Sequence, residues 1–337
     1  MEKTKILMLM SIYQKVSGHT RVVDNLSKFL VEEGFDVTIG AITFQKDLPN
    51  GVKKENLKLT NVISKIKKYD IIHNHQTKMN YFSLFTDKPF IFQYHGASMK
   101  LQKINLFLSL MLCQKKISKI VAVSKAALLQ LPKFTKNIPA KVIYNGIDTE
   151  YYKIESGFEQ NKVNPQLFFA GNLFRYKNVQ FIIKSLNKLK KQYPNFVLRI
   201  AGDGEYKIKL EKIIKEEKLE KNIFLLGRID DESLRKEYCS SDIYISASTF
   251  ETFGMPLLEA MSCCKPVVVS KIPPHEELVY ASKAGECFSI DNDEIIEKII
   301  KVYENKEELG ILGRRFAEKY NWVKIAKAYK ILYNEWT

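Results

Sequence analysis

Cysteines and long apolar runs are scarce in this chain, and their scarcity excludes several protein classes. The five cysteines among 337 residues are odd in number, scattered and without metal-ligand spacing. This pattern excludes a disulfide framework and a zinc module, and it favours reduced thiols in a cytoplasmic protein. The most apolar run, Ile104–Cys113, is too short for a membrane-spanning helix, which needs about 20 residues. No secretory signal is expected, because no small-residue cleavage motif follows a longer apolar stretch near the start.

Acidic side chains are scarce in the first half of the chain. Residues 1–150 carry 23 Lys and Arg against 11 Asp and Glu, a net charge of +12, whereas the rest carries 30 against 27, a net of +3. No acidic residue lies between Asp87 and Asp148, a stretch that holds ten lysines. Such a surface attracts phosphate, so anionic lipid, nucleic acid and phosphorylated substrates are candidate partners.

The length and the order of the expected elements predict two α/β domains. A chain this long exceeds one ordinary core, and its strands alternate with helices twice, which is typical of parallel sheets covered on both faces. The expected domains are residues 1–155 and 156–320, with an amphipathic C-terminal helix at 321–337. The boundary is expected near Ile147 to Asn164, where the polar stretch 155–165 separates the two sheets. Ligands of such sheets bind at the carboxyl ends of the strands. The expected strands are at 5–10, 35–42, 70–72, 89–94, 119–123, 166–170, 196–201, 223–226, 243–246, 266–270 and 285–290.

The segment Ser248–Val269 carries the most specific pattern of the chain. Glu251 lies in a loop after an expected strand, and a helix is expected to begin near Pro256, a favoured first-turn residue. Gly254 lets a ligand approach the backbone closely, and free N–H groups at a helix start suit a diphosphate. Because carboxylates repel phosphate, we interpret Glu251 and Glu259 as acceptors for sugar hydroxyls.

With these residues, the chain resembles the retaining GT-B glycosyltransferases of family 4. The signature of that family is two glutamates separated by seven residues around an F-G-x-P core, here Phe253–Pro256. The resemblance covers nearly the whole chain. The other family blocks, in order, are KILMLM with Ser17-Gly18, YDIIHNH (69–75), FQYHG (92–96), VAVSKAA (121–127), VIYNGID (142–148), FFAGNLFRYKN (168–178), AGDGE (201–205) and FLLGRI (224–229).

The resemblance implies a GT-B fold and transfer of a hexose from a UDP- or GDP-sugar to a glycan or a lipid-linked acceptor. It also implies that Glu251 binds hydroxyls of the transferred sugar, Glu259 the nucleotide ribose, and Lys177 the leaving diphosphate. His95 is expected to contact the donor sugar near the reacting carbon, and the C-terminal helix is expected to cross back to the first domain. The other implied donor contacts are Gly18, Gly171, Asn172, Arg175, Arg228, Phe253, Gly254 and Met255.

Two positions depart from the family pattern. The family usually has an arginine where this chain has Asn172, and Arg175 is the nearest replacement. The first glycine loop, often a glycine pair in the family, is Ser17-Gly18 here. Fixed positive charge from Lys177 and the helix start would stabilise the leaving group in place of a divalent metal. We therefore expect no cofactor and no metal.

Simpler interpretations stay open beside these. His95 can be a hydrogen-bonded core histidine, and Lys177 can be a solvated residue before a helix. A non-catalytic donor-binding or partner subunit would keep the same fold; the departure at Asn172 favours it, whereas the intact glutamate pair and Lys177 speak against it. Specific nucleic-acid binding is not expected, because the lysines accompany neither a nucleic-acid motif nor a platform of stacking aromatics.

The basic segment 100–141 begins with an apolar helix. Apolar residues occupy most of the helical surface between Leu101 and Leu112, and Lys115 and Lys116 follow. One interpretation is a buried helix with a solvated basic end. The other is an interfacial helix that places a cytoplasmic protein on the anionic face of a membrane.

Overall fold

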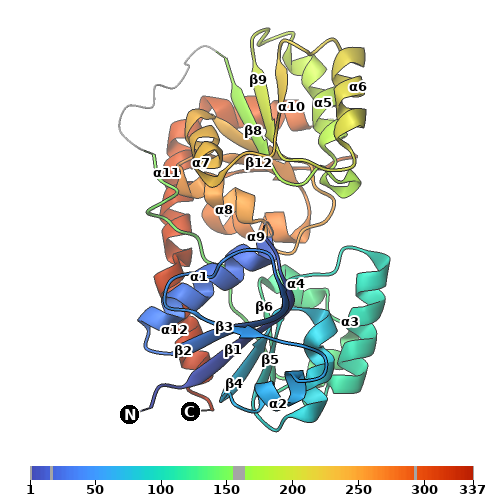
Figure 1. The fold of residues 1–337 in the computed structure, drawn as a ribbon. Coiled ribbons are helices and arrows are strands. Elements are labelled where there is room, and N and C mark those ends of the chain that lie inside the picture. Colours follow the sequence, from blue (N-terminus) through green and yellow to red (C-terminus); the bar gives the residue numbers. More distant parts are fainter. Residues whose placement is uncertain (1, 16–17, 155–163, 292–293, 337) are drawn as a thin grey trace. The chain divides into compact units, whose positions relative to one another are not determined.

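The computed structural model describes residues 2–15, 18–154, 164–291 and 294–336 (Figure 1). Its contacts divide the chain into a first unit, Met1–Gly146 with Tyr320–Thr337, and a second unit, Ile147–Lys319. The division falls at the amino-terminal end of the range Ile147 to Asn164 in which the sequence places the boundary, ahead of a division after residue 155. Ser17 of the expected glycine loop and most of the polar stretch 155–165 lie outside the described residues.

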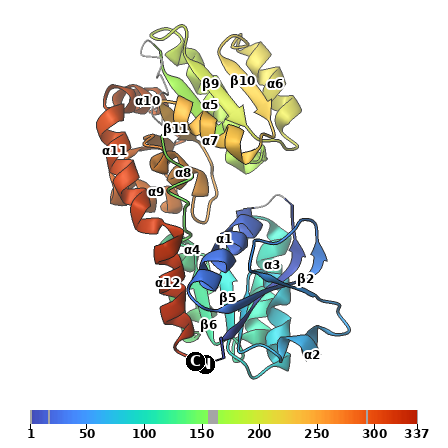
Figure 2. The ribbon, with the colours of Figure 1, turned by 60° about the vertical axis from the view of Figure 1, so that its left-hand side comes forward.

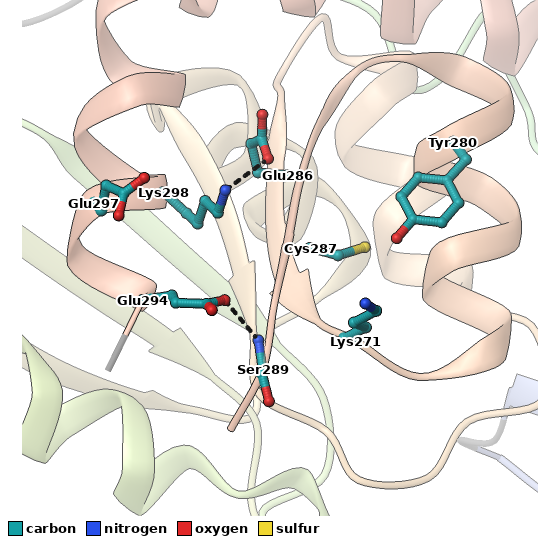
Figure 3. Close-up of a pocket in the computed structure, with 8 residues that line it drawn as sticks. All are labelled: Lys271, Tyr280, Glu286, Cys287, Ser289, Glu294, Glu297 and Lys298. Carbon is teal, nitrogen blue, oxygen red and sulfur yellow. Dashed lines mark hydrogen bonds and ion pairs between the residues drawn. The ribbon is translucent and has the colours of Figure 1, made fainter. Parts of the chain in front are cut away.

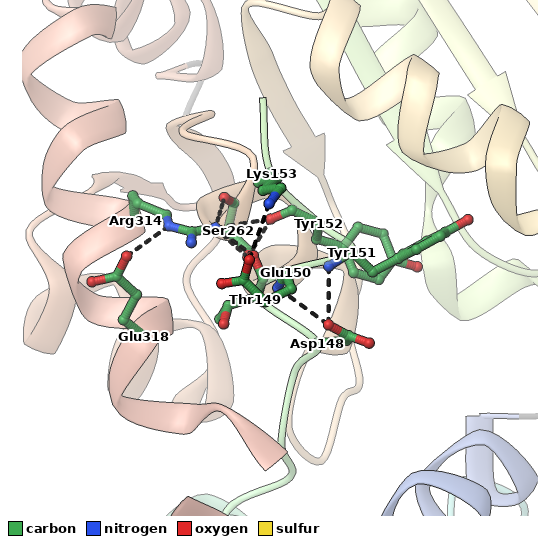
Figure 4. Close-up of polar contacts among 9 residues, drawn as sticks. All are labelled: Asp148, Thr149, Glu150, Tyr151, Tyr152, Lys153, Ser262, Arg314 and Glu318. Carbon is green, nitrogen blue, oxygen red and sulfur yellow. Dashed lines mark hydrogen bonds and ion pairs between the residues drawn. The ribbon is translucent and has the colours of Figure 1, made fainter. Parts of the chain in front are cut away.

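An arginine accounts for the earlier division. Arg314 Nη1 donates hydrogen bonds to the carbonyl oxygens of Thr149 (2.8 Å), Tyr152 (3.0 Å) and Ser262 (2.9 Å), all within the second unit (Figure 4). A guanidinium that satisfies several buried carbonyls fixes the backbone that supplies them. The segment after Ile147 is thus held to the second unit, although it precedes that unit's first strand.

The first unit is built on a parallel sheet of seven strands. Its order is β3-β2-β1-β4-β5-β6-β7, and every pairing is parallel. The strand order reverses between β1 and β4, which makes their carboxyl ends the topological switch point of this sheet. The strands are β1 (Lys5–Tyr13), β2 (Asp36–Phe44), β3 (Lys53–Asn56), β4 (Ile71–Asn74), β5 (Phe90–Tyr94), β6 (Lys119–Ala122) and β7 (Ala140–Val142).

Helices from both ends of the sequence complete the first unit. Helix α12 (Trp322–Tyr333) packs beside α1 (Gly18–Glu32), as both ribbon views show (Figures 1 and 2). Its buried face contributes Trp322, Tyr329 and Tyr333 to the core of this unit. The remaining helices are α2 (Val62–Ile66), the 3-10 segment η1 (Thr77–Phe85), α3 (Lys100–Cys113), α4 (Lys125–Leu129) and η2 (Lys133–Asn137).

The second unit repeats the plan with six parallel strands. Their order is β10-β9-β8-β11-β12-β13, and the switch point lies between β8 and β11. The strands are β8 (Gln166–Ala170), β9 (Val197–Ala201), β10 (Ile223–Gly227), β11 (Ile243–Ser246), β12 (Val267–Ser270) and β13 (Gly285–Phe288). The helices are η3 (Arg175–Lys177), α5 (Val179–Leu189), α6 (Lys207–Glu216), α7 (Asp231–Ser240), α8 (Met255–Ser262), α9 (Pro273–Ser282), α10 (Ile295–Glu304) and α11 (Lys306–Ala317), with η4 (Glu318–Tyr320) at the division.

The predicted class of two Rossmann-like halves is confirmed. Two strands escaped prediction, β3 and β7, which lie at the edges of the first sheet. Strand β3 reads Lys-Lys-Glu-Asn and is largely exposed, so it carries no apolar alternation. Charged, short edge strands are how sheets resist pairing with other chains. None of the helices in the described part of the chain is long and apolar enough to cross a membrane.

Candidate active site

An ion pair lies at the switch point of the second sheet. Lys177 ends η3, which follows β8, and Glu251 lies in the loop after β11. Lys177 Nζ is 2.5 Å from Glu251 Oε1, and the two side chains are only 13% and 18% exposed. Strands β8 and β11 are paired neighbours, so residues far apart in sequence meet here because their strands end together.

The surroundings keep Glu251 ionised. Burial alone would raise the pKa of its carboxyl, but Lys177 and His275 outweigh burial, and the pKa is lowered. His275 is fully buried, and burial lowers its pKa to about 4 although Glu251 acts in the opposite direction. At neutral pH the site therefore holds one carboxylate, one ammonium and one neutral imidazole.

Helix α8 begins directly after Glu251, with Gly254 as its N-cap. Gly254 has φ +100°, and a Cβ there would lie 3.4 Å from Leu257 Cδ1. The left-handed φ favours glycine, and Pro256 in the first turn is confirmed. The start of a helix carries a partial positive charge, which suits an anion.

Glu259 lies one turn further along α8 and is buried, with 3% exposure. The hydroxyl of Tyr238, on α7, donates a 2.8 Å hydrogen bond to Glu259 Oε2. Burial and the neighbouring carboxylate raise the pKa of Tyr238 well above its usual range, so the phenol remains a donor. Tyr238 was missed in the sequence, because nothing near it in α7 indicates that it orients a carboxylate.

The other predicted donor contacts of this unit divide into two groups. A Cβ on Gly171 (φ +156°) would lie 3.9 Å from Lys177 Cε, so Gly171 lies beside the ion pair. Asn172, Arg175 and Arg228 are exposed. Arg175 forms no ion pair with any residue that the structure describes, so its guanidinium is available to an anion. Whether it replaces the family arginine stays a prediction.

Gly18 and His95 belong to the first unit. Gly18 is the first residue of α1 and is exposed, with nothing within 4 Å of a Cβ added to it. His95 follows β5, and its Nε2 lies 3.1 Å from His75 Nδ1. Its contact with the donor sugar stays a prediction, as does that of Gly18 with the diphosphate.

His275 also escaped the sequence analysis. Its Nδ1–H donates to the carbonyl oxygen of Ser270 at 3.0 Å, and its Cδ2 would lie 3.8 Å from a Cβ on Gly254. It therefore packs under the start of α8 as a neutral ring. The only signal was its position after Pro273-Pro274, at the start of a helix.

A separate hollow of about 520 Å³ lies elsewhere on the second unit (Figure 3). Its charged groups contact one another: Lys298 Nζ lies 3.3 Å from Glu286, and Glu294 accepts a 3.3 Å hydrogen bond from the backbone N–H of Ser289. No predicted site residue lines it. We therefore do not assign the donor to this hollow.

The described residues also contain no group of three or more His, Cys, Asp and Glu side chains that could hold a metal ion. Asp230, part of the only Asp-Asp pair, caps α7 by accepting a 2.7 Å hydrogen bond from the N–H of Ser233. That carboxylate is occupied in starting a helix.

Two Rossmann-like halves, each built on a parallel sheet with its own switch point, are the architecture of the GT-B class. Comparisons with known proteins give the family. The model for Glycosyltransferase Family 4 matches residues 16–151, and the model for Glycosyl transferases group 1 matches residues 153–319. The chain belongs to the GT-B glycosyltransferases of these families.

Three similar proteins illustrate the family. Uncharacterized glycosyltransferase MJ1069 of Methanocaldococcus jannaschii is 32% identical over 65% of this chain and 59% of its own length. Alpha-monoglucosyldiacylglycerol synthase of Acholeplasma laidlawii is 30% identical over 43% of this chain and 36% of its own length. HepE of Anabaena, solved in complex with UDP, superposes with a TM-score of 0.80 over 98% of this chain and 100% of that one, at 20% identity. This chain spans less than two thirds of the length of the curated relatives that head the comparison.

Proposed function

We propose that this protein transfers a hexose from a UDP- or GDP-sugar to a glycan or a lipid-linked acceptor, retaining the anomeric configuration and using no metal. The observation that carries the proposal is the Lys177–Glu251 ion pair beside the start of α8. The ammonium of Lys177 can meet the diphosphate of a nucleotide-sugar, and the carboxylate of Glu251 can accept hydrogen bonds from its sugar hydroxyls.

The leaving group is the nucleoside diphosphate, which gains negative charge as the glycosidic bond breaks. Fixed donors aimed at that charge supply a large part of enzymatic rate enhancement. Lys177 supplies an ammonium, and Phe253, Gly254 and Met255 supply backbone N–H groups at the start of α8. In this proposal, these groups take the place of a divalent cation.

The two glutamates act on hydroxyls. Glu251 remains ionised, so both its oxygens accept hydrogen bonds, and it would hold hydroxyls of the transferred sugar. Glu259 would accept from the ribose while Tyr238 fixes the orientation of its carboxylate. Charge-assisted hydrogen bonds of this kind are roughly twice as strong as neutral ones.

The similar proteins support the choice of substrates to test first. HepE of Anabaena was solved with UDP, which supports a uridine donor here. The Acholeplasma synthase is named for a diacylglycerol product, which supports a lipid-linked acceptor. We propose that this protein works in the cytoplasm, on the cytoplasmic face of a membrane.

The exposed face of α3 supports the membrane contact. Leu101, Phe107, Leu108 and Leu112 are exposed, Leu101 by 75%, while Leu106 and Leu110 on the other face are buried. Basic residues of the segment 100–141 lie on and after the same helix. An apolar face next to lysines suits an anionic bilayer surface.

Vesicle co-sedimentation tests this contact. The protein is expected to bind vesicles containing phosphatidylglycerol more than phosphatidylcholine vesicles, and the difference should shrink with salt. Leu101→Ser with Leu108→Ser should weaken binding. Ile208→Ser, at a 79% exposed residue of the second unit, is the matched control. Equal binding to both vesicles, or equal loss in the control, would contradict the proposal.

A thermal-shift screen tests the donor site. UDP, GDP, ADP and their sugar conjugates are each added to the protein; a ligand at 100 times its Kd adds about 2.7 kcal/mol of stability. One nucleotide is expected to raise the melting temperature, and Glu259→Ala should abolish the shift. Tyr238→Phe, which keeps the carboxylate but removes its orienting hydrogen bond, should only reduce the shift.

Three outcomes bear on the proposal. A nucleotide-dependent shift with turnover of the same donor supports it. A shift without turnover against any acceptor supports the non-catalytic subunit. Turnover that EDTA abolishes and manganese restores would show that the metal-free mechanism is wrong.

A further inference from the structure

Lys177 and Glu251 occupy each other in this structure, with Nζ and Oε1 2.5 Å apart. In the proposed function, Lys177 contacts the diphosphate and Glu251 the sugar hydroxyls, so donor binding has to draw the ammonium from the carboxylate. Sugar hydroxyls are neutral, so they satisfy the hydrogen bonds of Glu251 but not its charge. A largely buried carboxylate without a cation is strongly destabilised. Donor binding therefore calls for a second cation beside Glu251.

His275 is a titratable side chain buried next to this pair. It lies on α9, is fully buried, and has its Cδ2 3.8 Å from the position of a Cβ on Gly254, the N-cap of α8. Burial lowers its pKa to about 4, while Glu251 acts to raise the pKa and Lys177 to lower it. The two members of the ion pair are therefore the charged side chains that act on this ring, in opposite directions.

The hydrogen bonds of His275 fix its tautomer. Nδ1 lies 3.0 Å from the carbonyl oxygen of Ser270, which can only accept, so Nδ1 carries the proton. Ser270 Oγ donates to the carbonyl oxygen of Ser248 at 2.5 Å and, 3.2 Å from Nδ1, accepts from the same ring N–H. Nε2 is then an unprotonated acceptor, and it has no hydrogen-bond partner among the residues that the structure describes. A buried nitrogen of this kind is uncommon and is the place for an added proton.

The start of α8 also acts on the ring. The partial positive charge at a helix start disfavours an imidazolium, in the same direction as Lys177. A diphosphate bound there brings negative charge and cancels this effect. Donor binding would thus remove both positive influences on His275 at once and leave the carboxylate of Glu251 to favour protonation.

We propose that donor binding draws Lys177 from Glu251 and that His275 then takes up a proton from solvent at Nε2, so that an imidazolium replaces the ammonium as the counter-ion of Glu251. His275 acts through Glu251, which it keeps ionised for the sugar hydroxyls, and is therefore a positioning residue. This inference rests on the proposed donor site. Because binding and protonation favour each other, the donor should bind more tightly as the pH falls from about 8 to about 6.

Neutral histidines of the first unit have no such carboxylate. His75 and His95 line a cavity of about 420 Å³, together with several carboxamides, where β1, β4 and β5 end. Of the described residues that line it, Lys78 is the one with a full charge, and none is Asp or Glu. His75 Nε2 lies 3.4 Å from Met8 Sδ, which has no proton to donate, so His75 Nδ1 accepts from His95 Nε2–H across 3.1 Å. Histidines of this unit therefore supply the control.

Carbon-13 NMR of the imidazole rings tests the coupling without any ligand. The chain has five histidines, and His275→Asn identifies the signal of His275. Its pKa is about 4 in the wild type. In Lys177→Met, where Glu251 loses its closest cation, the ring should bind protons at least about tenfold more tightly, which is one pH unit. Adding Glu251→Gln should abolish this gain. An unchanged titration in Lys177→Met would overturn the inference.

Calorimetry tests the exchange in the wild-type protein and so does not depend on the folding of a variant. UDP-glucose and GDP-mannose are titrated at about pH 6, above the pKa of His275 in the free protein, in buffers of different ionisation enthalpy. The diphosphate of a sugar nucleotide has no ionisation near this pH, so a proton gain comes from the protein. We expect net proton uptake on binding.

Two variants make the uptake specific to His275. His275→Asn retains an N–H donor for the carbonyl oxygen of Ser270 but takes up no proton, so binding should proceed without uptake and lose its pH dependence. His73→Asn removes a fully buried histidine of the first unit and should leave the uptake unchanged. Uptake that persists in His275→Asn would overturn the inference.

The two measurements distinguish this inference from the proposed function. If either sugar nucleotide binds without proton uptake, the inference is wrong and the donor proposal stands. If neither binds, the proposed donor site is wrong and the exchange on donor binding is wrong with it, whereas a raised pKa of His275 in Lys177→Met would still show its coupling to Glu251.

Discussion

At the end of β8, the second unit places an ammonium against a carboxylate; at the end of β1, the first unit places carboxamides against neutral imidazoles. Both positions are switch points of parallel sheets with closely similar strand order. One is lined by Lys177 and Glu251, the other by Gln76, Gln102 and His95. The same backbone plan thus presents an ion pair in one unit and carboxamides with neutral imidazoles in the other, because the loops after the strands, not the sheet, set the chemistry.

The net charge of the first half of the chain differs from the charge of its cavity. The first half carries the excess positive charge of the chain, yet its cavity is nearly uncharged. The lysines lie on the outer helices and loops, where they suit a membrane surface. Net charge therefore describes the outside of this unit and not its cavity.

The largest expected effect comes from removing charge at the second switch point. Lys177→Met should lower the turnover of the sugar nucleotide by about 10²- to 10³-fold, the usual cost of one donor to a developing oxyanion. Lys177→Arg, which keeps the charge, should retain more activity. UDP release measures the rate.

Lys78→Met is the matched variant in the first unit and should change UDP release little. Unfolding followed by circular dichroism shows whether Lys177→Met remains folded, since it leaves Glu251 buried without its closest cation. If Lys177→Met and Lys78→Met lower the rate of UDP release equally, the proposed difference between the switch points of the two units is wrong.

The next effect concerns acid stability. Burial lowers the pKa of His73 to about 3, and those of His75 and His95 lie well below the usual value. A group with a depressed folded pKa adds stability that is fully present above its unfolded pKa, about 6.5, and is lost as pH falls toward the folded pKa. The second unit has one such histidine, His275. Between pH 6.5 and 4 the first unit should therefore lose more stability, at about 1.4 kcal/mol per pKa unit.

Fluorescence separates the two units. Both tryptophans, Trp322 and Trp336, lie in the first unit. The urea midpoint from tryptophan emission should fall more steeply with acid than the midpoint of the second transition seen by circular dichroism. His73→Asn, which cannot be protonated, should flatten the dependence. A pH-independent emission midpoint would show that this prediction is wrong.

A smaller effect is expected on the tautomer of His95 when His75 is replaced. In the wild type, His95 should carry its proton on Nε2, donated to His75. His75→Asn retains an acceptor near the place of Nδ1 and should preserve this tautomer, whereas His75→Leu should change it and lower transfer about five- to tenfold. Nitrogen-15 shifts of the His95 ring measure the tautomer without any substrate. A wild-type His95 protonated on Nδ1 would contradict the hydrogen-bond assignment.

The smallest expected effect on stability separates two glycines. Gly18→Ala should change the free energy of unfolding by at most about 1 kcal/mol, because α1 is open there. Gly202→Ala in the second unit should cost more, since its Cβ would lie 1.9 Å from the carbonyl oxygen of Gly171 and φ is +146°. If Gly18 approaches the diphosphate, Gly18→Ala should raise the KM for the donor in a stable protein. An unchanged KM would remove Gly18 from the site.

Elements that depend on the residue pattern within one short segment could be predicted from the sequence. The strands of both sheet interiors and the start of α8 near Pro256 follow from periodicity and turn chemistry. The Glu251–Glu259 spacing predicts a candidate donor site because both residues lie in one short segment.

The contacts that the sequence did not predict join residues that are distant in the chain. Tyr238 reaches Glu259 from another helix, and His275 reaches the start of α8 from a third. The cavity of the first unit combines residues after β1, β4 and β5 with α3, and none of these segments shows a motif for it. Edge strand β3 has no apolar period. The hydrogen bonds that hold Thr149 and Tyr152 to the second unit come from Arg314, far along the chain.

Helix α12 sets the order in which the two units can fold during synthesis. The first unit needs Trp322, Tyr329 and Tyr333 in its core, but the ribosome synthesises them only after the whole second unit. The second unit is continuous in sequence and can fold as soon as it emerges, so the later half of the chain is expected to fold before the earlier half is complete. Until then, the nascent first unit exposes the apolar surface that α12 will cover, and a ribosome stalled before residue 322 would hold one folded unit and one open core.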